Sequence, residues 1–272
     1  MSCESSPSVA HFDGAVAWFR LNRPEAKNAL NAALVEQLDA FIDQVEHSDD
    51  IHVVILTGTG DTFCAGADLK GVVAADGSVD ATQLLRFVRQ VSRVLSRLAA
   101  VRQPVIAAVN GLTLAGGLEL VMHCDLVIAS EQARLGDGHI TYGLLPGAGG
   151  AARLSRLIGP TRSKYLAFTG ATLPATDCQA MGLVNEVLPD SELEARAAEL
   201  AGQLAAHSTS ALRLFKQAID DGLEQALPTA LRLEHLALSE HLHSGHIDEG
   251  LTAFREKRAP EFDRSSAKEE SS

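Results

Sequence analysis

Two segments of the chain combine small residues with a position directly after a buried strand. The first is TFCAGADLK, residues 62–70, and the second is NGLTLAGGLE, residues 110–119. Small residues let a ligand reach backbone N–H groups, and glycines that open a helix add unpaired donors with a partial positive charge. One N–H group from each segment could therefore form an oxyanion hole. Taken singly, each segment is explained equally well by a tight turn between a strand and a helix.

Two side chains near these segments could move protons. Glu119 ends the second segment, where a carboxylate could also serve only to complement a helix dipole. His139 lies within LGDGHITYGLLPGAGG, residues 135–150, and an imidazole exchanges protons near neutral pH. Asp137 could orient this imidazole if the segment is extended. The alternative for His139 is that it lines a pocket and hydrogen-bonds substrate or water.

Strands and helices alternate in the part of the sequence that carries these residues. A hairpin is expected over 9–21, apolar strands over 52–57, 104–110 and 125–129, and helices over 31–47, 84–98 and 116–123. Continuous apolar strands are typical of a parallel sheet covered on both faces, so the fold class is α/β. We expect residues 1–190 to form the core that carries the site. Residues 191–272 form a helical C-terminal region, an oligomerisation region that docks on the core or on a neighbouring subunit, with a disordered tail over 263–272.

Composition and charge exclude several classes of protein. The chain has 272 residues, 46% of them hydrophobic and 4% aromatic, and a net charge of −12, which argues against binding nucleic acid or an anionic membrane. No apolar run approaches the roughly 20 residues that a membrane-spanning helix needs. The four cysteines form no CxxC pair and the N-terminus shows no leader pattern, so we expect reduced thiols and a cytoplasmic location.

Other familiar sites are not supported by the sequence. Gly58 and Gly60 follow a strand, but Phe63 stands where a dinucleotide fingerprint needs its third glycine. There is no GxSxG motif and no P-loop. The histidines at 241, 243 and 246 have no carboxylate partner at ligand spacing, so a solvated helix terminus is a better interpretation than a metal site, and no metal is expected.

Several motifs together resemble the crotonase superfamily, also called the enoyl-CoA hydratase/isomerase family. They are LNRPEAKNAL, FCAGADLK, NGLTLAGGLEL, CDLVIAS, YGLLPGAGG, the segment from Thr169 to Pro189, and FREKRAPEF, and they follow in the right order over nearly the whole chain. The resemblance implies a crotonase-like spiral of ββα units with a helical C-terminal part. It also implies a trimer, commonly paired into a hexamer, and no cofactor beyond the CoA that belongs to the substrate.

The resemblance also assigns residues. Family members bind acyl-CoA thioesters and hold an enolate-like oxygen with two backbone N–H groups, which match Ala67 and Gly116 here. Positions that match the CoA path are Ala26, Lys27, Ala65, Asp68 and Leu69, and a C-terminal aromatic and base that often approach CoA match Phe254 and Lys257. Both lysines could equally be ordinary solvated side chains. We expect the acyl tail to meet residues 71–85 and the region around Tyr142.

The resemblance breaks at one catalytic position. Glu119 matches the first catalytic carboxylate of family hydratases, but the second glutamate, seven residues before Pro146, is His139 in this chain. The leading hypothesis is an enoyl-CoA hydratase-like lyase in which Glu119 activates water and His139 assists. The alternatives are another reaction on the same scaffold (double-bond isomerisation, thioester hydrolysis or carbon–carbon cleavage) and an acyl-CoA binder with little turnover.

Overall fold

The computed structural model describes residues 6–71 and 79–262 of the chain. The larger sheet contains β1 (Ser8–Asp13), β2 (Val16–Leu21), β3 (Val53–Gly58), β5 (Val105–Val109), β7 (Leu126–Ser130) and β10 (Glu186–Leu188), in that order. The smaller sheet contains β4 (Thr62–Cys64), β6 (Leu112–Leu114), β8 (Arg134–Gly136) and β9 (Thr172–Pro174). Only the outer pairs β1–β2 and β8–β9 are antiparallel, so the predicted α/β fold with mainly parallel pairing is confirmed.

The helices follow the strands in a repeated order. The longer ones are α1 (Ala32–Glu46), α2 (Ala81–Ala100), α4 (Gly150–Ile158), α5 (Pro160–Thr169), α7 (Leu193–Ala205), α8 (Thr209–Leu223), α9 (Leu227–His241) and α10 (His246–Glu256). The shorter ones are α3 (Gly116–Val121), α6 (Ala175–Ala180) and the 3-10 helices η1 (Pro24–Ala26), η2 (Leu69–Gly71), η3 (His139–Tyr142) and η4 (Asp190–Glu192). Three times in succession, one strand joins the larger sheet, the next joins the smaller sheet, and a helix follows. This is the expected spiral of ββα units.

Both faces of the larger sheet are buried because successive residues of its central strand point to opposite sides. Val54 and Leu56 of β3 face the main core, which includes the apolar sides of α1 and α2. Val53 and Ile55 face the other way and pack against Leu193, Ala197 and Ala201 of α7. The continuous apolar strand at this place in the sequence is therefore explained by cover on both faces.

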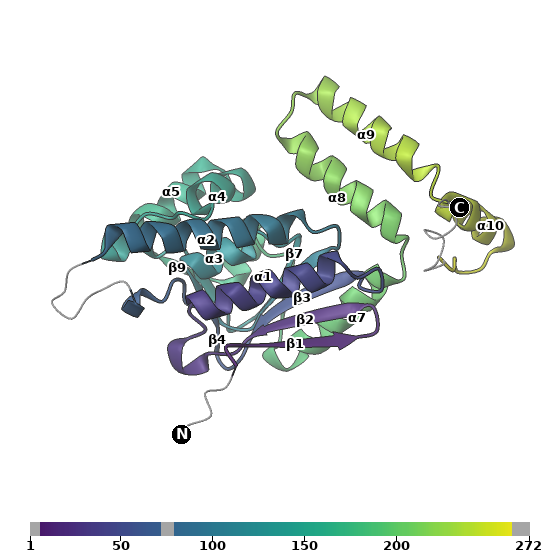
Figure 1. Ribbon diagram of the computed structural model, residues 1–272. Helices are drawn as coiled ribbons and strands as arrows, with labels where there is room; N and C mark the ends of the chain where they lie inside the picture. Colours follow the sequence, from purple (N-terminus) through teal and green to yellow (C-terminus); the bar gives the residue numbers. More distant parts are fainter. Residues whose placement is uncertain (1–5, 72–78, 263–272) are drawn as a thin grey trace.

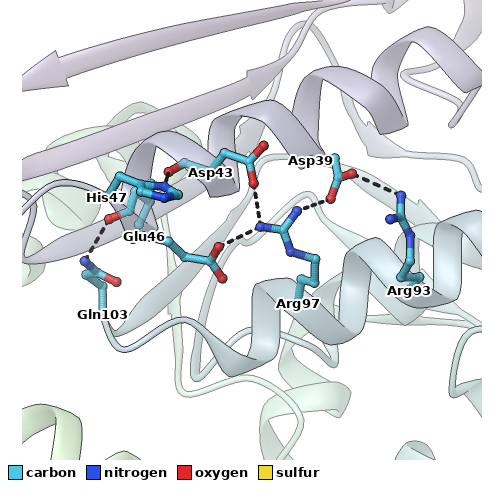
Figure 2. A network of polar contacts seen from close by, with 8 residues as sticks. Asp39, Asp43, Glu46, His47, Arg93, Arg97 and Gln103 are labelled. Atoms are coloured by element: carbon cyan, nitrogen blue, oxygen red, sulfur yellow. Dashed lines mark hydrogen bonds and ion pairs between the residues drawn. The ribbon is translucent and has the colours of Figure 1, made fainter.

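An ion-pair network joins α1 to α2 on the outside of the core. The Arg97 guanidinium of α2 contacts the carboxylates of Asp39, Asp43 and Glu46 on α1, with distances of 2.5 to 2.6 Å, and Arg93 contacts Asp39 at 3.1 Å (Figure 2). The network holds α2 against α1, and α2 in turn forms one wall of the cavity described below.

The C-terminal helices divide into two groups. Helix α7 packs on the larger sheet, whereas α8, α9 and α10 extend away from the two sheets as an arm (Figure 1). The Lys216 ammonium on α8 ties the base of the arm to the core, since it lies 2.8 Å from Asp125 Oδ2 and donates to the carbonyl oxygen of Gln103. The division of the chain at residue 190 stays a prediction, and the tail over 263–272 lies outside the described residues. None of the described helices is long and apolar enough to cross a membrane.

Candidate active site

The smaller sheet brings the two glycine-bearing segments together. Strands β4 and β6 are parallel neighbours, with Thr62 opposite Leu112, so the residues that leave their carboxyl ends meet at one edge. The approach is close: a Cβ built on Gly117 would lie 2.1 Å from the carbonyl oxygen of Cys64, and one built on Gly116 would lie 3.5 Å from the Ala67 nitrogen. Glycine is therefore required at position 117, and the amides of Ala67 and Gly116 are neighbours.

Local geometry leaves both of these amides available to a ligand. Leu30 donates its N–H to the carbonyl oxygen of Gly66 and accepts the N–H of Asp68, both at 2.8 Å, so the Ala67 N–H between them points away from Leu30. Gly116 is the first residue of α3, and its N–H has no intrahelical acceptor. Within residues 6–71 and 79–262, neither amide donates to a protein acceptor. Two neighbouring N–H groups that are available in this way are what an oxyanion hole requires.

Backbone strain lies next to this donor pair. Ala115, which precedes α3, has φ 50° and ψ −116°, a conformation that residues with a Cβ rarely adopt. Such strain costs about 1–3 kcal/mol and persists where the surrounding structure enforces it. Here the Ala115 N–H donates to the carbonyl oxygen of Gly136 at 3.1 Å, which ties the start of α3 to β8.

Glu119 lies one turn into α3, and its side chain is buried. Its Oε1 accepts the N–H groups of Ala148 at 2.7 Å and Gly150 at 2.9 Å, at the amino end of α4. Unpaired amides and the positive end of a helix dipole both favour a carboxylate there. In the described part of the chain both hydrogen bonds to this carboxylate fall on Oε1, so Oε2 can accept a proton or a hydrogen bond from a ligand.

Two glycines of the PGAGG motif make this arrangement possible. Gly149 has φ +101°, and a Cβ on Gly150 would lie 2.5 Å from the Cβ of Pro146 and 3.2 Å from Glu119 Oε1. Behind them, the His123 ring bonds through Nδ1 to the carbonyl oxygen of Glu119 at 2.7 Å. Burial lowers the pKa of His123 to about 4 and outweighs this hydrogen bond, so the ring is neutral at neutral pH.

His139 begins η3, directly after β8. Asp137 Oδ1 accepts the backbone N–H of His139 at 3.1 Å and lies 3.0 Å from its ring Nδ1. The predicted contact is present, but the expectation that it needs an extended segment is wrong, because the chain turns at Gly138 with φ +68°. Burial acts to lower the pKa of His139, and the hydrogen bond to Asp137 together with the charges of Asp137 and Glu119 outweighs it, so the pKa is raised above its usual value.

A single cavity of about 80 Å³ joins these groups. The four residues predicted to be catalytic all line it, and so does Leu69. The rest of the lining is mostly apolar and comprises Leu30, Leu84, Phe87, Val88, Val91, Leu144, Leu145, Gly147 and Ala148. The acyl-tail contacts stay a prediction. Of the two regions named for them, Leu84 and, beside Tyr142, Leu144 and Leu145 line the cavity; Tyr142 itself is 81% exposed and does not, and residues 72–78 lie outside the described residues.

The predicted CoA positions of the N-terminal half lie near one another. The Ala65 N–H donates to the carbonyl oxygen of Lys27 at 3.0 Å, and Ala26 ends η1 immediately before it. Asp68 forms a half-buried ion pair with Arg23 at 2.8 Å. Burial acts to raise the pKa of Asp68, but its hydrogen bonds and the charges of Arg23 and Lys70 lower it further, so the carboxylate is charged at neutral pH.

The predicted CoA positions of the C-terminus lie elsewhere in the same chain. Phe254 is 83% exposed on α10, and Lys257 follows at the end of that helix. Helix α10 begins beside the start of α8, where His246 bonds to Ser208, and it lies away from α3 and β4 (Figure 1). Within a single chain, Phe254 and Lys257 therefore do not reach the cavity.

Several residues that form or support the site were not predicted from the sequence. The amides of Ala148 and Gly150 donate hydrogen bonds to Glu119. The glycines of the PGAGG motif are the sequence signal that could have indicated these donors. Phe87, Val88 and Val91 form a wall of the cavity, although their helical spacing alone indicates only a buried face. Asn28 is fully buried with φ 52°, and its amide donates to the carbonyl oxygens of Thr59 and Thr62, which braces the loop of Lys27 against β4.

His241 and His246 lie where α9 and α10 return to the start of α8. His246 bonds through Nδ1 to Ser208 Oγ at 2.6 Å, and its ring meets that of His241 edge-on. No group of three or more His, Cys, Asp or Glu side chains able to hold a metal ion occurs in the described part of the chain.

Comparisons with known proteins agree with the fold. The family model for enoyl-CoA hydratase/isomerase matches residues 11–265. A Bacillus subtilis protein described as putative enoyl-CoA hydratase/isomerase YngF is 43% identical over 244 residues, which cover 89% of this chain and 92% of that protein. The short-chain-enoyl-CoA hydratase of Clostridium acetobutylicum is 39% identical over 247 residues, 90% of this chain and 93% of that protein. The crystal structure of an enoyl-CoA hydratase from Bacillus anthracis has a TM-score of 0.90 to this chain at 38% identity and covers 95% of this chain and 100% of that one.

This chain belongs to the enoyl-CoA hydratase/isomerase family. The resemblance found in the sequence is thereby confirmed.

Proposed function

We propose that this protein is an enoyl-CoA hydratase that adds water across the double bond of a 2-enoyl-CoA thioester. The observation that carries the proposal is the convergence on one apolar cavity of two free backbone N–H groups, a buried carboxylate and an imidazole. The names of the relatives support it, since one is a short-chain-enoyl-CoA hydratase of similar length.

In the proposed reaction, the N–H groups of Ala67 and Gly116 hold the thioester carbonyl oxygen. Glu119 Oε2 takes a proton from water, and the water oxygen forms a bond to C3 of the substrate. The π electrons of the C2–C3 bond move toward the thioester and give an enolate, whose negative oxygen the two amides stabilise. C2 then takes a proton from His139. The product is a 3-hydroxyacyl-CoA, and a proton passing from Glu119 to His139 restores the starting state.

The proposed steps use protein groups alone, so the proposal includes no metal or prosthetic group, and CoA enters as part of the substrate. Ala26, Lys27, Ala65, Asp68 and Leu69 would bind it. A cytoplasmic location is part of the proposal and agrees with the free thiols of Cys64, Cys124 and Cys178.

The test follows purified protein mixed with crotonyl-CoA and with longer enoyl-CoA thioesters. Hydration removes the absorbance of the conjugated thioester without releasing a free thiol. Glu119→Gln should slow this loss about 10²–10⁴-fold, and the exposed carboxylate variant Glu192→Gln, a matched control, should retain the wild-type rate. Free CoA thiol would identify a hydrolase, and a raised melting temperature with intact substrate would identify a binder; either outcome contradicts the proposal.

We further propose that the protein is a trimer or a hexamer formed from two trimers. Large apolar side chains stand exposed along the arm of the single chain; they are Phe215, Ile219, Leu223, Leu227, Leu231, Leu236, Leu238, Leu242, Leu251 and Phe254. Packing this surface against a second subunit would bury it, and it would let Phe254 and Lys257 approach CoA in a neighbour. Light scattering after size-exclusion chromatography tests the assembly, and a monomer at micromolar concentration would contradict it.

A further inference from the structure

The carboxylate of Asp137 is buried and directed at one residue. Its side chain is 5% exposed, and the hydrogen bonds that the structure records for it, within the described residues, both join Oδ1 to His139. A buried carboxylate is costly unless hydrogen bonds or opposite charge compensate it. The compensation here comes from the backbone N–H and the ring of the same histidine. His139 therefore compensates the burial of the Asp137 carboxylate, and the carboxylate in return fixes the orientation of the His139 ring.

The contact decides which ring nitrogen of His139 meets the substrate. Since Oδ1 of a carboxylate can only accept, the ring nitrogen at 3.0 Å donates, and this assigns the proton to Nδ1. The ring lines the cavity that also contains Glu119. With Nδ1 occupied, Nε2 is the atom that remains for the substrate.

The negative charges near His139 both act to raise the pKa of its ring. Asp137 belongs to its own turn and Glu119 to α3, and both carboxylates favour the protonated ring. Helix α5 also packs against η3, and its Arg162, Lys164 and Tyr165 are not among the groups that shift the pKa of His139. Asp137 acts on the pKa of His139 through both a hydrogen bond and its charge, whereas Glu119 acts through its charge alone.

We propose that Asp137 is a positioning residue for this reaction: it holds the His139 ring with Nδ1 bonded, so that Nε2 delivers the proton to C2 opposite Glu119. The inference rests on the proposed hydratase function and deepens it. In this step the Nε2–H bond breaks and a C2–H bond forms with the electron pair of the enolate. His139 leaves the step neutral, with one proton on Nδ1, which still donates a hydrogen bond to Asp137 Oδ1.

The test compares wild-type protein with Asp137→Asn and Asp137→Ala, and with the exposed variant Asp50→Asn as a matched control. Asparagine keeps a carbonyl acceptor for the ring but removes the charge. Because His139 must be protonated to act as an acid, activity is lost as pH rises through its pKa. The alkaline limb of the kcat/KM profile should therefore move to lower pH by about 1 unit in Asp137→Asn. Asp137→Ala should lower kcat about 10- to 100-fold with little change in KM, which is short of the about 10²–10⁴-fold that a whole general acid supplies.

A second readout does not depend on turnover. Histidine titration is followed by NMR with isotope-labelled histidine, and the His139 signal is assigned by its loss in His139→Gln. Wild type should show the Nδ1–H tautomer and a titration midpoint higher than in Asp137→Asn. If wild type hydrates crotonyl-CoA but neither the alkaline limb nor the His139 titration moves in Asp137→Asn, the inference is overturned. If wild type hydrates none of the enoyl-CoA substrates, the proposed function fails instead.

Discussion

Glu119 has two separable roles, and a pair of substitutions distinguishes them. Glu119→Gln keeps an oxygen at the position where Oε1 accepts the amides of Ala148 and Gly150 at 2.7 and 2.9 Å. Glu119→Ala removes that acceptor and leaves both buried N–H groups without a partner. The first variant removes mainly the proposed base, and the second also removes the support of the PGAGG segment.

The expected magnitudes follow from the two hydrogen bonds. A hydrogen bond to a charged group contributes about 1.5–3 kcal/mol and a neutral one about 0.5–1.5 kcal/mol, so the glutamine loses about 2–3 kcal/mol over both bonds. The lower cost of burying a neutral group offsets part of this loss and leaves a net effect of about 1 kcal/mol. An unpaired buried N–H costs about 1–3 kcal/mol, so the alanine variant loses about 4 kcal/mol in total.

The assay measures stability and turnover on the same samples. At about 2–4 °C for each kcal/mol, Glu119→Ala should melt about 6–12 °C below Glu119→Gln at equal protein concentration. Glu119→Gln should hydrate crotonyl-CoA about 10²–10⁴-fold more slowly than wild type with KM nearly unchanged. Equal melting temperatures for the two variants would refute the described contacts of Oε1. Full turnover by the glutamine variant would refute the assignment of Glu119 as the base.

Three further predictions concern the same region. Gly66→Ala should lower kcat/KM because its Cβ would lie 3.3 Å from the Gly116 nitrogen at a φ of +102°, and steady-state kinetics that match wild type would show that the Gly116 amide is not used. Ala115→Gly should relieve about 1–3 kcal/mol of backbone strain, less about 0.5–1 kcal/mol of added chain entropy, and raise the melting temperature, whereas a lower one would show that the observed φ is not strained. The pKa of His123 falls from 6.5 to about 4 on folding, so the unfolded chain binds more protons and about 3 kcal/mol of stability should be lost as pH falls through that range. Denaturant unfolding at several pH values measures this loss; His123→Gln should reduce it, and an unchanged slope would contradict the prediction.

The sequence was sufficient for the hairpin and the central strands of the larger sheet and for α1, α2 and α3, but not for the strands of the smaller sheet. Continuous apolar strands and helical spacing predicted the order of these elements, and residues 62–70 and 110–119 follow the parallel neighbours β3 and β5, as expected. The short strands β4 and β6 lie within these two segments and were not predicted. Parallel neighbours deliver their carboxyl ends to the same edge, so two motifs on such strands must meet. The positions of Ala67 and Gly116 follow from this rule together with the family resemblance.

The partners of the charged side chains were not predictable in the same way. Glu119 is held by amides that lie about 30 residues further along the chain, and Arg23 pairs with Asp68, which is 45 residues further along. Such contacts depend on how helices pack, which residue spacing does not encode. The wall formed by Phe87 and Val91 was missed for a related reason, because a helix face that lines a cavity has the same apolar period as one that packs against a core.

The turn that carries His139 has a consequence for how this active site can change. The imidazole and the carboxylate that supports it are two residues apart, and the support includes the backbone of the histidine itself. A change of two codons could therefore replace the proposed acid and its support together, while the amides proposed to bind the thioester oxygen, being main chain, would be inherited with the fold.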